Sequence, residues 1–370
     1  MKVAFVNLKR QYKTYKKEID HAIQEVLDTA GFVMGPKNEE FEKAFAKFCN
    51  KKYCVGVNSG TDALFLALKA YGIGDGDEVI TAPNSYTASA MAATNAGAKP
   101  IFTDVDSRSY NIDPTKIEAK ITKKTKAIIP VHLYGQPADM DPIVTIAKKH
   151  NLIIIEDCCQ AHGAKYKGKV LPHTDSGAFS FYPGKNLGAF GDGGAVVTSS
   201  KQIKTALEYL RNDGSIEKYV HKTIGYKSRL DTLQASILLT KLKHLKEFVE
   251  KRRRAAQKYN KLLKGVAQIK TPVEMDYAHN AYHIYAVLAE RRDALKKYLR
   301  INGISTVIHY PTPIHLQEAY KDLVYKKGDF PISEELAAKT ISLPMFPEIK
   351  GTEIEYVCET IRNFYSHQQR

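Results

Sequence analysis

Three short segments of the sequence carry residue types that can do chemistry. The apolar run Leu152–Ile155 ends in Glu156 and Asp157, and a carboxylate at the carboxyl end of a buried parallel strand lies where open α/β sheets bind ligands. The turn Asn58–Thr61 leads into an apolar helix, whose first N–H groups and Thr hydroxyl suit an anion such as a phosphate. Lys185 stands alone in a glycine-dense loop flanked by aromatic residues. Desolvation there would lower its pKa and give a nucleophilic amine.

Each segment also has a purely structural interpretation. The two carboxylates suit a helix cap or a buried salt bridge, the turn before the helix suits an ordinary N-cap, and the lysine loop suits a flexible surface loop. Two nucleotide-binding motifs are excluded. Gly184-Lys185 is followed by Asn186 rather than Ser or Thr, so there is no P-loop, and no G-x-G-x-x-G follows a strand.

Short apolar runs alternate with amphipathic stretches through the first 210 residues. Spacings of three or four predict helices at 12–26, 41–48, Thr61–Ala70, Pro142–His150 and Gln202–Leu210. Strands are predicted at Glu78–Ala82, Pro100–Thr103, Ala127–Val131, Leu152–Glu156, Ala178–Phe181 and Ala195–Thr198. This alternation is typical of an α/β protein with a largely parallel sheet.

The pattern changes after about residue 230. Thr232 to Leu263 contains neither Pro nor Gly, and predicts a single helix longer than about 40 Å that bridges two domains. A small α+β unit follows, with predicted strands at Tyr282–Leu288 and Thr306–Tyr310 and helices at Asp293–Ile301 and Glu353–Tyr365. We therefore predict a large domain over residues 1–250 and a small domain over 251–370, with the N-terminal segment packing on the small one.

The composition is that of an ordinary globular protein apart from its charge. The 370 residues include 55 Lys and Arg against 40 Asp and Glu, a net charge of +15, which suggests nucleic acid, a membrane surface or anionic metabolites as partners. No apolar stretch approaches the roughly 18 residues of a membrane span, and the N-terminus is too polar for a secretory signal. The five cysteines form no C-x-x-C pair, so we expect no disulfide framework, no metal site and a cytoplasmic location.

The three segments together resemble the pyridoxal-phosphate-dependent sugar-nucleotide aminotransferases of the DegT/StrS family. That family has a phosphate turn, then E-D-x-x-Q-A, then F-S-F-x-P-G-K-N-L-G-x-x-G-D-G-G, matched here by Glu156–Gly163 and Ser180–Gly194. The resemblance extends from Gly35-Pro36 through Pro130–Gly135 to Leu343–Met345. It implies an α/β fold of fold type I, with a three-layer αβα large domain around a mostly parallel sheet and a small α+β C-terminal domain.

The resemblance also implies roles for the reactive residues. Lys185 would hold pyridoxal 5'-phosphate as a Schiff base and carry the proton while the cofactor passes through its pyridoxamine 5'-phosphate form. Asp157 would face the pyridine nitrogen, Gln160 would lie beside the phenolic oxygen, and Tyr86 would stack on the ring, with a core aromatic as the alternative for Tyr86.

The phosphate is implied to lie against Gly60, Thr61 and Ser180. A further ligand is implied in the segment Gly225–Asp231, where the family has G-Y-N-S-R-L-D and its Asn reaches the phosphate from the neighbouring subunit. Lys227 replaces that Asn here, and an ammonium can contact a phosphate as a point charge. The same match implies a homodimer with shared active sites.

Substrate residues follow from a second match. Gly303–Gln317 resembles the G-I-x-T-x-I-H-Y-P-x-P-x-H-x-Q of members that aminate position 3 of the hexose. We therefore expect amino transfer from L-glutamate to C3 of a nucleotide-linked, dTDP-bound 3-keto-6-deoxyhexose, the alternative being a 4-keto or UDP-linked sugar. Members that replace the Schiff-base lysine by His perform deoxygenation, so Lys185 favours plain transamination.

The candidate substrate residues are Tyr182, Arg229, His309, Tyr310 and His315. Arg229 has a structural alternative, an ion pair with Asp231 or another acid, and His309 and His315 have one as buried, hydrogen-bonded histidines.

Two other functions are compatible with parts of the sequence. The charge, densest at Lys251–Arg254 and again among Lys120, Lys123, Lys124 and Lys126, suggests a nucleic-acid-binding protein. These clusters lack the interleaved aromatic residues of stacking platforms, and no nucleic-acid-binding motif is present, so we expect neither nucleic acid nor membrane as a partner. A regulatory relative with an idle site is the other possibility, since folds host several roles.

Overall fold

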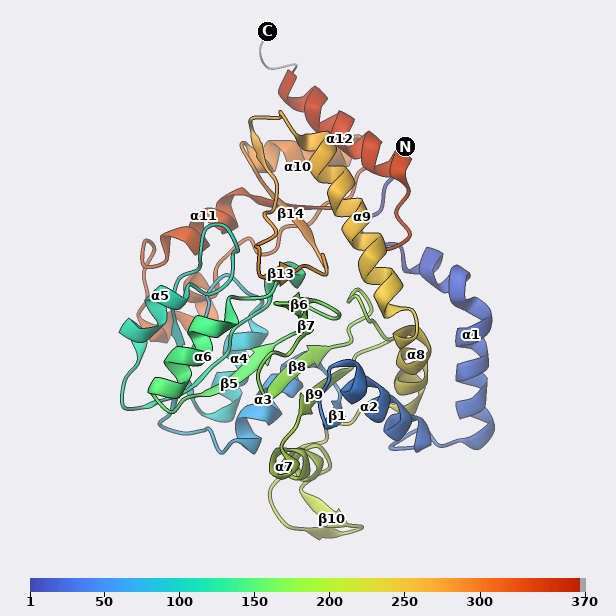
Figure 1. The fold of residues 1–370 in the computed structure, drawn as a ribbon, viewed down its shortest axis with the longest axis vertical. Helices are drawn as coiled ribbons and strands as arrows, with labels where there is room; N and C mark the ends of the chain where they lie inside the picture. The colour runs from blue at the N-terminus through green and yellow to red at the C-terminus, as the bar shows by residue number, and fades with distance from the viewer. Residues whose placement is uncertain (367–370) are drawn as a thin grey trace.

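The computed structural model describes residues 1–366 (Figure 1). Its centre is a seven-stranded sheet with the strand order β1 (Tyr53–Val57), β9 (Gly194–Thr198), β8 (Ser176–Ser180), β5 (Ile153–Asp157), β4 (Thr125–Ile128), β2 (Glu78–Thr81) and β3 (Lys99–Phe102). Strands β3, β2, β4, β5 and β8 pair in parallel, and β9 runs antiparallel to both β8 and β1. The largely parallel sheet expected from the sequence is therefore confirmed, with one reversed strand.

Helices cover both faces of this sheet. Successive strand residues point to opposite sides, and because the residues on both sides are apolar, both faces are buried against helices. Val79 and Ala127 pack with α3 (Gly60–Ala70), α4 (Ala88–Ala96) and α7 (Lys201–Arg211). Their neighbours Ile80 and Ile128 pack on the other face with α2 (Pro36–Phe48), α6 (Met140–Lys149) and α8 (Thr232–Leu242). Because both faces are buried, these strands read as continuous apolar runs. The result is the three-layer αβα architecture of fold type I.

A second, smaller hydrophobic cluster forms the upper part of the molecule in Figure 1. An antiparallel sheet of β12 (Ile269–Lys270), β14 (Tyr285–Ala289) and β15 (Thr340–Leu343) packs there with α9 (Leu245–Leu263), α10 (Arg292–Ile301) and α12 (Gly351–Ser366). Val3 belongs to the same cluster and bridges Ile304. The chain then returns to the large sheet through α1 (Leu8–Thr29). The boundary near residue 250 stays a prediction.

The single long helix predicted over Thr232–Leu263 is wrong. The structure has α8 and α9, separated at Lys243 and His244. The two helices serve different partners: α8 packs on α1 and α2 beside the large sheet, whereas the far half of α9 packs on α12. A heptad-like pattern predicts both helices but does not show the change of direction between them. At 19 residues, α9 spans about 28 Å.

The predicted strand Thr306–Tyr310 is also wrong. Within this segment, only Val307 forms a bridge, to Ser342 on β15, and the rest of the segment is irregular. Its β-branched residues suggested a strand, but His309 and Tyr310 turn toward a cavity instead.

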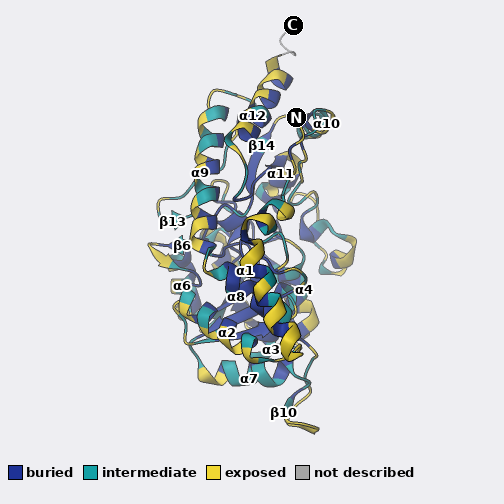
Figure 2. Ribbon diagram, turned by 90° about the vertical axis from the view of Figure 1, so that its right-hand side faces the viewer, coloured by how far each residue is buried: buried dark blue, intermediate teal, exposed yellow. Residues whose placement is uncertain are grey.

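The remaining elements are short. They are α5 (Pro114–Ile117), β6 (Lys165–Tyr166), β7 (Lys169–Val170), β10 (Ser215–Glu217), β11 (Val220–His221), β13 (Ala278–His279), α11 (Pro331–Lys339) and the 3₁₀ turns Glu118–Lys120, Leu133–Gly135, Ile314–Leu316 and Glu318–Leu323. The β10–β11 hairpin projects from the end of the molecule away from the C-terminus, and its residues are mostly exposed (Figure 2). In the described part of the chain, no helix has the length and apolarity needed to cross a membrane.

The densest basic run is largely occupied in holding the fold. The Arg252 guanidinium is buried and donates to the carbonyls of Tyr282, His283 and Met345 at 3.1–3.2 Å. Arg253 pairs with Glu274, and Lys251 pairs with Glu247 at 2.6 Å. The run therefore does not form the free basic stripe that a nucleic-acid site needs.

Candidate active site

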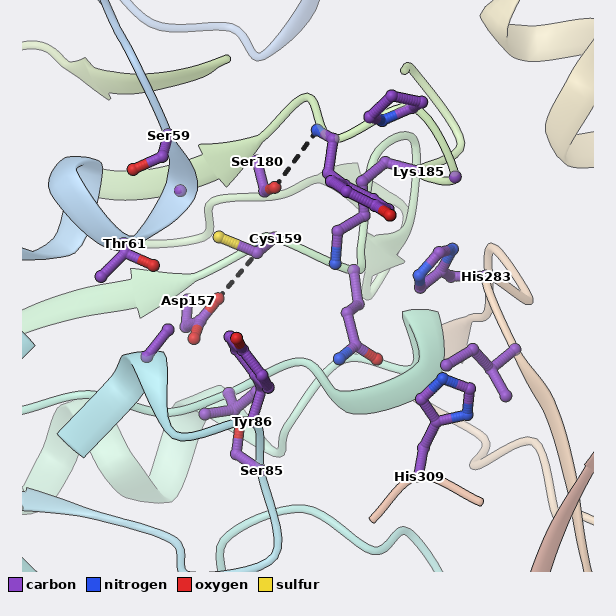
Figure 3. Close-up of a pocket in the computed structure, with 18 of the residues that line it drawn as sticks. Ser59, Thr61, Ser85, Tyr86, Asp157, Cys159, Ser180, Lys185, His283 and His309 are labelled. Atoms are coloured by element: carbon purple, nitrogen blue, oxygen red, sulfur yellow. Dashed lines mark hydrogen bonds between the residues drawn. The ribbon is translucent and has the colours of Figure 1, made fainter. Parts of the chain in front are cut away.

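A cavity of about 730 Å³ opens at the carboxyl ends of the parallel strands. This is the edge at which open α/β sheets bind ligands. Segments that directly follow or end β1, β2, β5 and β8 supply Gly60, Tyr86, Asp157 and Ser180. Figure 3 shows Asp157, Thr61 and Tyr86 on one side of the Lys185 amine and His283 and His309 on the other. The sheet thus gathers residues that lie more than 100 positions apart.

The Lys185 loop is fixed rather than flexible. The backbone N–H of Lys185 donates to the Tyr182 carbonyl at 2.8 Å, and Ala189 closes the loop onto Phe181 at 2.8 Å. From outside, Asn186 donates to the Ala281 carbonyl at 3.0 Å. The surface-loop alternative therefore does not hold.

The Lys185 side chain presents a reactive amine. Burial lowers its pKa from the ordinary lysine value, although the neighbouring Cys159 and Asp157 act in the opposite direction. Within the described chain, its Nζ has no hydrogen-bond partner. An amine with a lowered pKa and a free lone pair is a nucleophile.

Asp157 ends β5 with its carboxylate almost wholly buried, at 5% exposure. Ser89 Oγ donates to its Oδ2 at 2.8 Å, and the Cys159 backbone N–H donates to its Oδ1 at 3.1 Å. Two donors leave further lone pairs on the carboxylate that face the cavity it lines. The structure thus holds one oriented acceptor for a cationic or N–H group.

The start of α3 forms another part of the cavity wall. Ser59 is the N-cap and accepts from the Asp62 N–H at 3.1 Å. A Cβ at Gly60 would lie 2.5 Å from the Ser180 Cβ, so only glycine lets the helix start approach β8 this closely. The unpaired N–H groups there, with the hydroxyls of Thr61 and Ser180, are donors of the kind that bind anions. The N-cap interpretation is confirmed, and phosphate binding stays a prediction.

Gln160 and the aromatic residues form the side wall. Gln160 accepts from the Tyr134 N–H at 2.8 Å and donates to the Tyr310 hydroxyl at 3.1 Å. Tyr310 in turn lies 5.8 Å, ring centre to ring centre, from Tyr86. Tyr86 is 55% exposed and lines the cavity, so the core-aromatic alternative is wrong.

His309 and Tyr182 complete the predicted residues that line the cavity. The Nδ1 of His309 bonds the Ser342 hydroxyl at 2.9 Å, and its backbone carbonyl accepts from the Tyr134 hydroxyl. Burial, helped by Lys185, lowers the pKa of His309 to about 4. The ring is therefore neutral at physiological pH. Tyr182 is largely exposed at the mouth.

Three predicted site residues do not line this cavity. His315 is buried against Phe330 and bonds Glu334 at 3.1 Å, which agrees with its structural alternative. Arg229 donates to the Asn212 side chain at 3.1 Å rather than pairing with Asp231. Lys227 is exposed at the base of the β10–β11 hairpin, where it bridges Asn212. Any role of Lys227 in the site would require a neighbouring subunit.

Several residues that line the cavity or bond its lining residues were missed from the sequence. Ser89 is a small polar residue inside a helix, and Cys159 occupies a variable position of the acidic motif. Neither residue type indicated a functional site. Phe5 and Val6 line the cavity from the N-terminal segment, far from every motif. His283 lies within a predicted strand and belongs to no motif, so the sequence did not indicate it as a site residue.

A buried network behind Asp157 fixes the end of β5. Glu156 accepts from the backbone N–H of His173 at 2.9 Å, from the Thr174 hydroxyl at 2.6 Å and N–H, and from His132 Nε2 at 2.9 Å. The Ala138 N–H donates to His132 Nδ1 at 3.0 Å, so Nε2 carries the proton. With Cys158 these groups resemble a metal cluster, but the Glu156 and His132 atoms are already bonded to protein. For Glu156, the structural alternative of a buried pair is therefore correct, with His132 as its partner.

We expect Glu156→Ala to lower the free energy of unfolding by about 3–5 kcal/mol, because the buried His132 and three partly buried donors of His173 and Thr174 lose their acceptor. Burial raises the pKa of Glu156, but hydrogen bonds from His132 and Thr174 outweigh it and hold the pKa below 4.5. This stabilisation is therefore complete above pH 4.5 and is lost as the pH falls through the lower folded-state value. Urea titrations across pH 3–7 measure both effects.

The matched control is Glu118→Ala, which removes an exposed carboxylate paired with Lys149 and His150. Its effect should be much smaller at every pH. A Glu156→Ala protein as stable as this control would show that the network does not stabilise the fold.

Comparison with known proteins agrees with this geometry. Residues 13–362 match the DegT/DnrJ/EryC1/StrS aminotransferase family. A "dTDP-3-amino-3,6-dideoxy-alpha-D-galactopyranose transaminase" of Aneurinibacillus thermoaerophilus is 45% identical over 98% of this chain and 99% of its own. A "Pleiotropic regulatory protein" of Geobacillus stearothermophilus is 44% identical over 99% of this chain and all of its own.

The crystal structure of DesV from S. venezuelae, in complex with a ketimine intermediate, superposes with a TM-score of 0.97. It is 43% identical and covers 98% of both chains. Both the sequence match and the superposition extend over nearly the whole chain. The chain therefore belongs to the DegT/DnrJ/EryC1/StrS aminotransferase family.

Proposed function

We propose that this aminotransferase uses pyridoxal 5'-phosphate to transfer the amino group of L-glutamate to C3 of a dTDP-linked 3-keto-6-deoxyhexose. The observation that carries the proposal is the shared cavity of Lys185, Asp157 and the N-terminus of α3. A nucleophilic amine, an oriented carboxylate and an anion site are the three groups that a phosphorylated pyridine aldehyde needs.

The residues present fit that cofactor. Thr61, Ser180 and the first N–H groups of α3 would hold its phosphate. Asp157, with two of its lone pairs already used by Ser89 and Cys159, would accept the ring N–H, and Tyr86 would cover one ring face. The Gln160 side chain, fixed from both ends, would lie beside the ring oxygen.

The bound cofactor supplies an electron sink for the carbon that loses or gains a proton. The protein supplies the proton transfer. Burial lowers the pKa of Lys185, so a larger fraction of its amine is uncharged and can take a proton and return it to the adjacent carbon. The Asp157 carboxylate keeps the ring nitrogen protonated and so maintains the sink.

The nature of the sugar substrate is supported by the relatives and by the segment around His309. The A. thermoaerophilus relative is named for a dTDP-3-amino sugar, and His309 and Tyr310 of the matched segment both line the cavity. Their neutral hydrogen-bonding groups suit sugar hydroxyls. A UDP-linked or 4-keto sugar is the alternative substrate.

A homodimer would complete the site. The β10–β11 hairpin carries Tyr219, which is 83% exposed, and is followed by Ile224, which is 86% exposed. Apolar side chains this exposed on a projecting hairpin favour contact with a second copy. Lys227 lies at the base of this hairpin, and the residue that it replaces in the family reaches the phosphate from the neighbouring subunit, so we expect Lys227 to approach that site in the dimer. Light scattering should give twice the mass of one chain.

The test separates the two half-reactions. The protein loaded with pyridoxal phosphate should be yellow and should lose that absorbance on addition of L-glutamate, while its bound cofactor converts to the pyridoxamine form. In the reverse direction, dTDP-3-amino-3,6-dideoxyhexoses should cause the same change, and a UDP-linked or a 4-amino sugar should not.

Three results would contradict the proposal in different ways. A protein that binds no pyridoxal phosphate would exclude the cofactor, and a response to 4-amino sugars alone would move the amination to C4. Cofactor binding without turnover of any sugar nucleotide would favour a regulatory protein, the role in the name of the G. stearothermophilus relative.

A further inference from the structure

His283 lines the cavity on the side away from Asp157 (Figure 3). Neither the acidic motif nor the lysine loop contains it. It directly precedes β14, at the junction between the large sheet and the upper hydrophobic cluster. Lys185 and His309, which line the same cavity, both lower the pKa of His283.

The backbone around His283 is held from three directions. Arg252 donates to its carbonyl at 3.1 Å from α9. The Ala281 N–H donates to the Gly135 carbonyl at 3.0 Å, and the Ala281 carbonyl accepts from Asn186, the residue next to Lys185. Gly135 has a φ of 101°, and a Cβ there would lie 2.9 Å from the His283 backbone nitrogen.

The neighbouring residue Tyr282 has a φ of 43°, in the left-handed region. Its N–H donates to the Asn280 side chain at 2.7 Å, which supports this conformation. A non-glycine residue with positive φ persists where surrounding contacts over-determine it, and such residues cluster at functional sites. The segment Asn280–Ile284 thus holds His283 in one orientation relative to Lys185.

The imidazole of His283 is uncharged. Burial lowers its pKa well below the ordinary value, and the nearby Lys185, Arg252, His309 and His162 lower it further. Its Nδ1 is buried without a partner in the described part of the chain. An unpaired lone pair is tolerated there better than an unpaired N–H, so Nε2 carries the hydrogen and offers it to the cavity.

We infer that His283 donates a hydrogen bond from Nε2 to a hydroxyl of the sugar substrate, and that it does not bind a carboxylate of the amino donor. This rests on the proposed function. A carboxylate pairs best with a cation, whereas the His283 ring is neutral and the nearby Arg252 guanidinium already donates to three backbone carbonyls. A hydroxyl needs only one neutral donor. His283 is thus a specificity-determining residue for the sugar half-reaction.

The test compares His283→Phe, which removes the donor, with His283→Asn, which keeps an N–H. The probes are L-glutamate and dTDP-3-amino-3,6-dideoxy-α-D-galactopyranose, each mixed with the pyridoxal-phosphate form in a stopped-flow spectrometer. His283→Phe should lower kcat/KM about tenfold for the amino sugar and leave it within about twofold for glutamate. His283→Asn should restore part of the loss.

A binding measurement complements the rates. Calorimetric titration of the same amino-sugar nucleotide into the pyridoxamine-phosphate form should give a Kd about tenfold weaker for His283→Phe. His279→Phe is the matched control, because His279 lies on β13 and pairs with Glu250 outside the cavity. It should change neither half-reaction.

The remaining outcomes overturn the inference. Equal loss in both half-reactions, loss with glutamate alone, or no change in either variant would each do so. If His283→Phe does not fold, His283→Ala and His283→Asn are tested instead. A His283→Ala protein that behaves as wild type, or a His283→Asn protein that is impaired only with glutamate, then overturns the inference. A wild type that responds to neither probe overturns the proposed function as well, whereas normal wild-type turnover with unaffected variants overturns only the role of His283.

Discussion

Lys185→Ala is expected to lower kcat by about 10⁴-fold or more, because one change removes both the nucleophile and the group that moves the proton. The variant should also lose covalent attachment of the cofactor, and with it the absorbance band that belongs to the lysine-bound form. The cavity should otherwise persist, since the loop is fixed by the backbone of Lys185 and by Asn186 rather than by the lysine side chain. Steady-state assays and absorbance spectra measure the two effects.

Two further lysines sharpen this result. Lys201→Ala, at the exposed start of α7, should behave as wild type. Lys241 is buried, donates to the Gly188 carbonyl and has a pKa lowered by burial to about 8, so it is the other buried amine near the loop. A Lys185→Ala protein that retains a covalent cofactor would identify Lys241 or another lysine as the attachment site.

Asp157→Asn should produce the second largest effect, a fall in kcat of about 10²–10³-fold. An amide cannot stabilise a proton on the ring nitrogen, so the electron sink weakens while the lysine remains. The side chain keeps its shape, and the Cys159 N–H can still donate to its oxygen. Cofactor affinity should fall less than kcat. Rates of the glutamate half-reaction, together with the Kd for pyridoxal phosphate, separate the two quantities.

The control for Asp157 is Ser89→Ala, which removes one neutral donor and leaves the carboxylate. Its effect on kcat should be about tenfold at most. Equal effects from Ser89→Ala and Asp157→Asn would mean that the orientation of this side chain matters and its charge does not.

Much of the fold was predictable because local patterns and tertiary burial agree. Strands such as Ile153–Asp157 are apolar on both faces and end at the ligand edge of the sheet, which is the signature of a parallel sheet. The break between α8 and α9 was not predictable, because it depends on which surface each helix packs against. The irregular segment around His309 was not predictable either, since its side chains turn toward the cavity.

Some residues of the candidate site belong to local motifs and were predictable, whereas others are positioned by distant segments and were not. Lys185, Asp157 and the turn before α3 carry local motifs, and the structure brings all three to one cavity. His283 has no motif, because its position depends on Arg252 and Asn186 from distant segments. His315 matched a motif but lies against Glu334, since sequence similarity does not show where a side chain points. Arg229 and Lys227 also matched a motif, but neither lines the cavity.

The net charge of +15 suggested a nucleic-acid-binding protein, but the densest basic run is mostly paired within the fold. Arg252 binds three carbonyls, and Arg253 and Lys251 pair with acids. The remaining excess charge is best interpreted as a solvated surface with a modest long-range attraction for anionic nucleotide sugars.

Whether Lys185 carries the cofactor can be measured directly. Reduction of the resting protein with borohydride fixes a lysine-bound pyridoxyl group permanently, and peptide mass spectrometry then locates it. We predict one labelled peptide, with the label on Lys185, and no label after prior conversion of the cofactor by L-glutamate. A label on Lys241 or another lysine, or no label on protein that has been loaded with pyridoxal phosphate, would contradict this prediction.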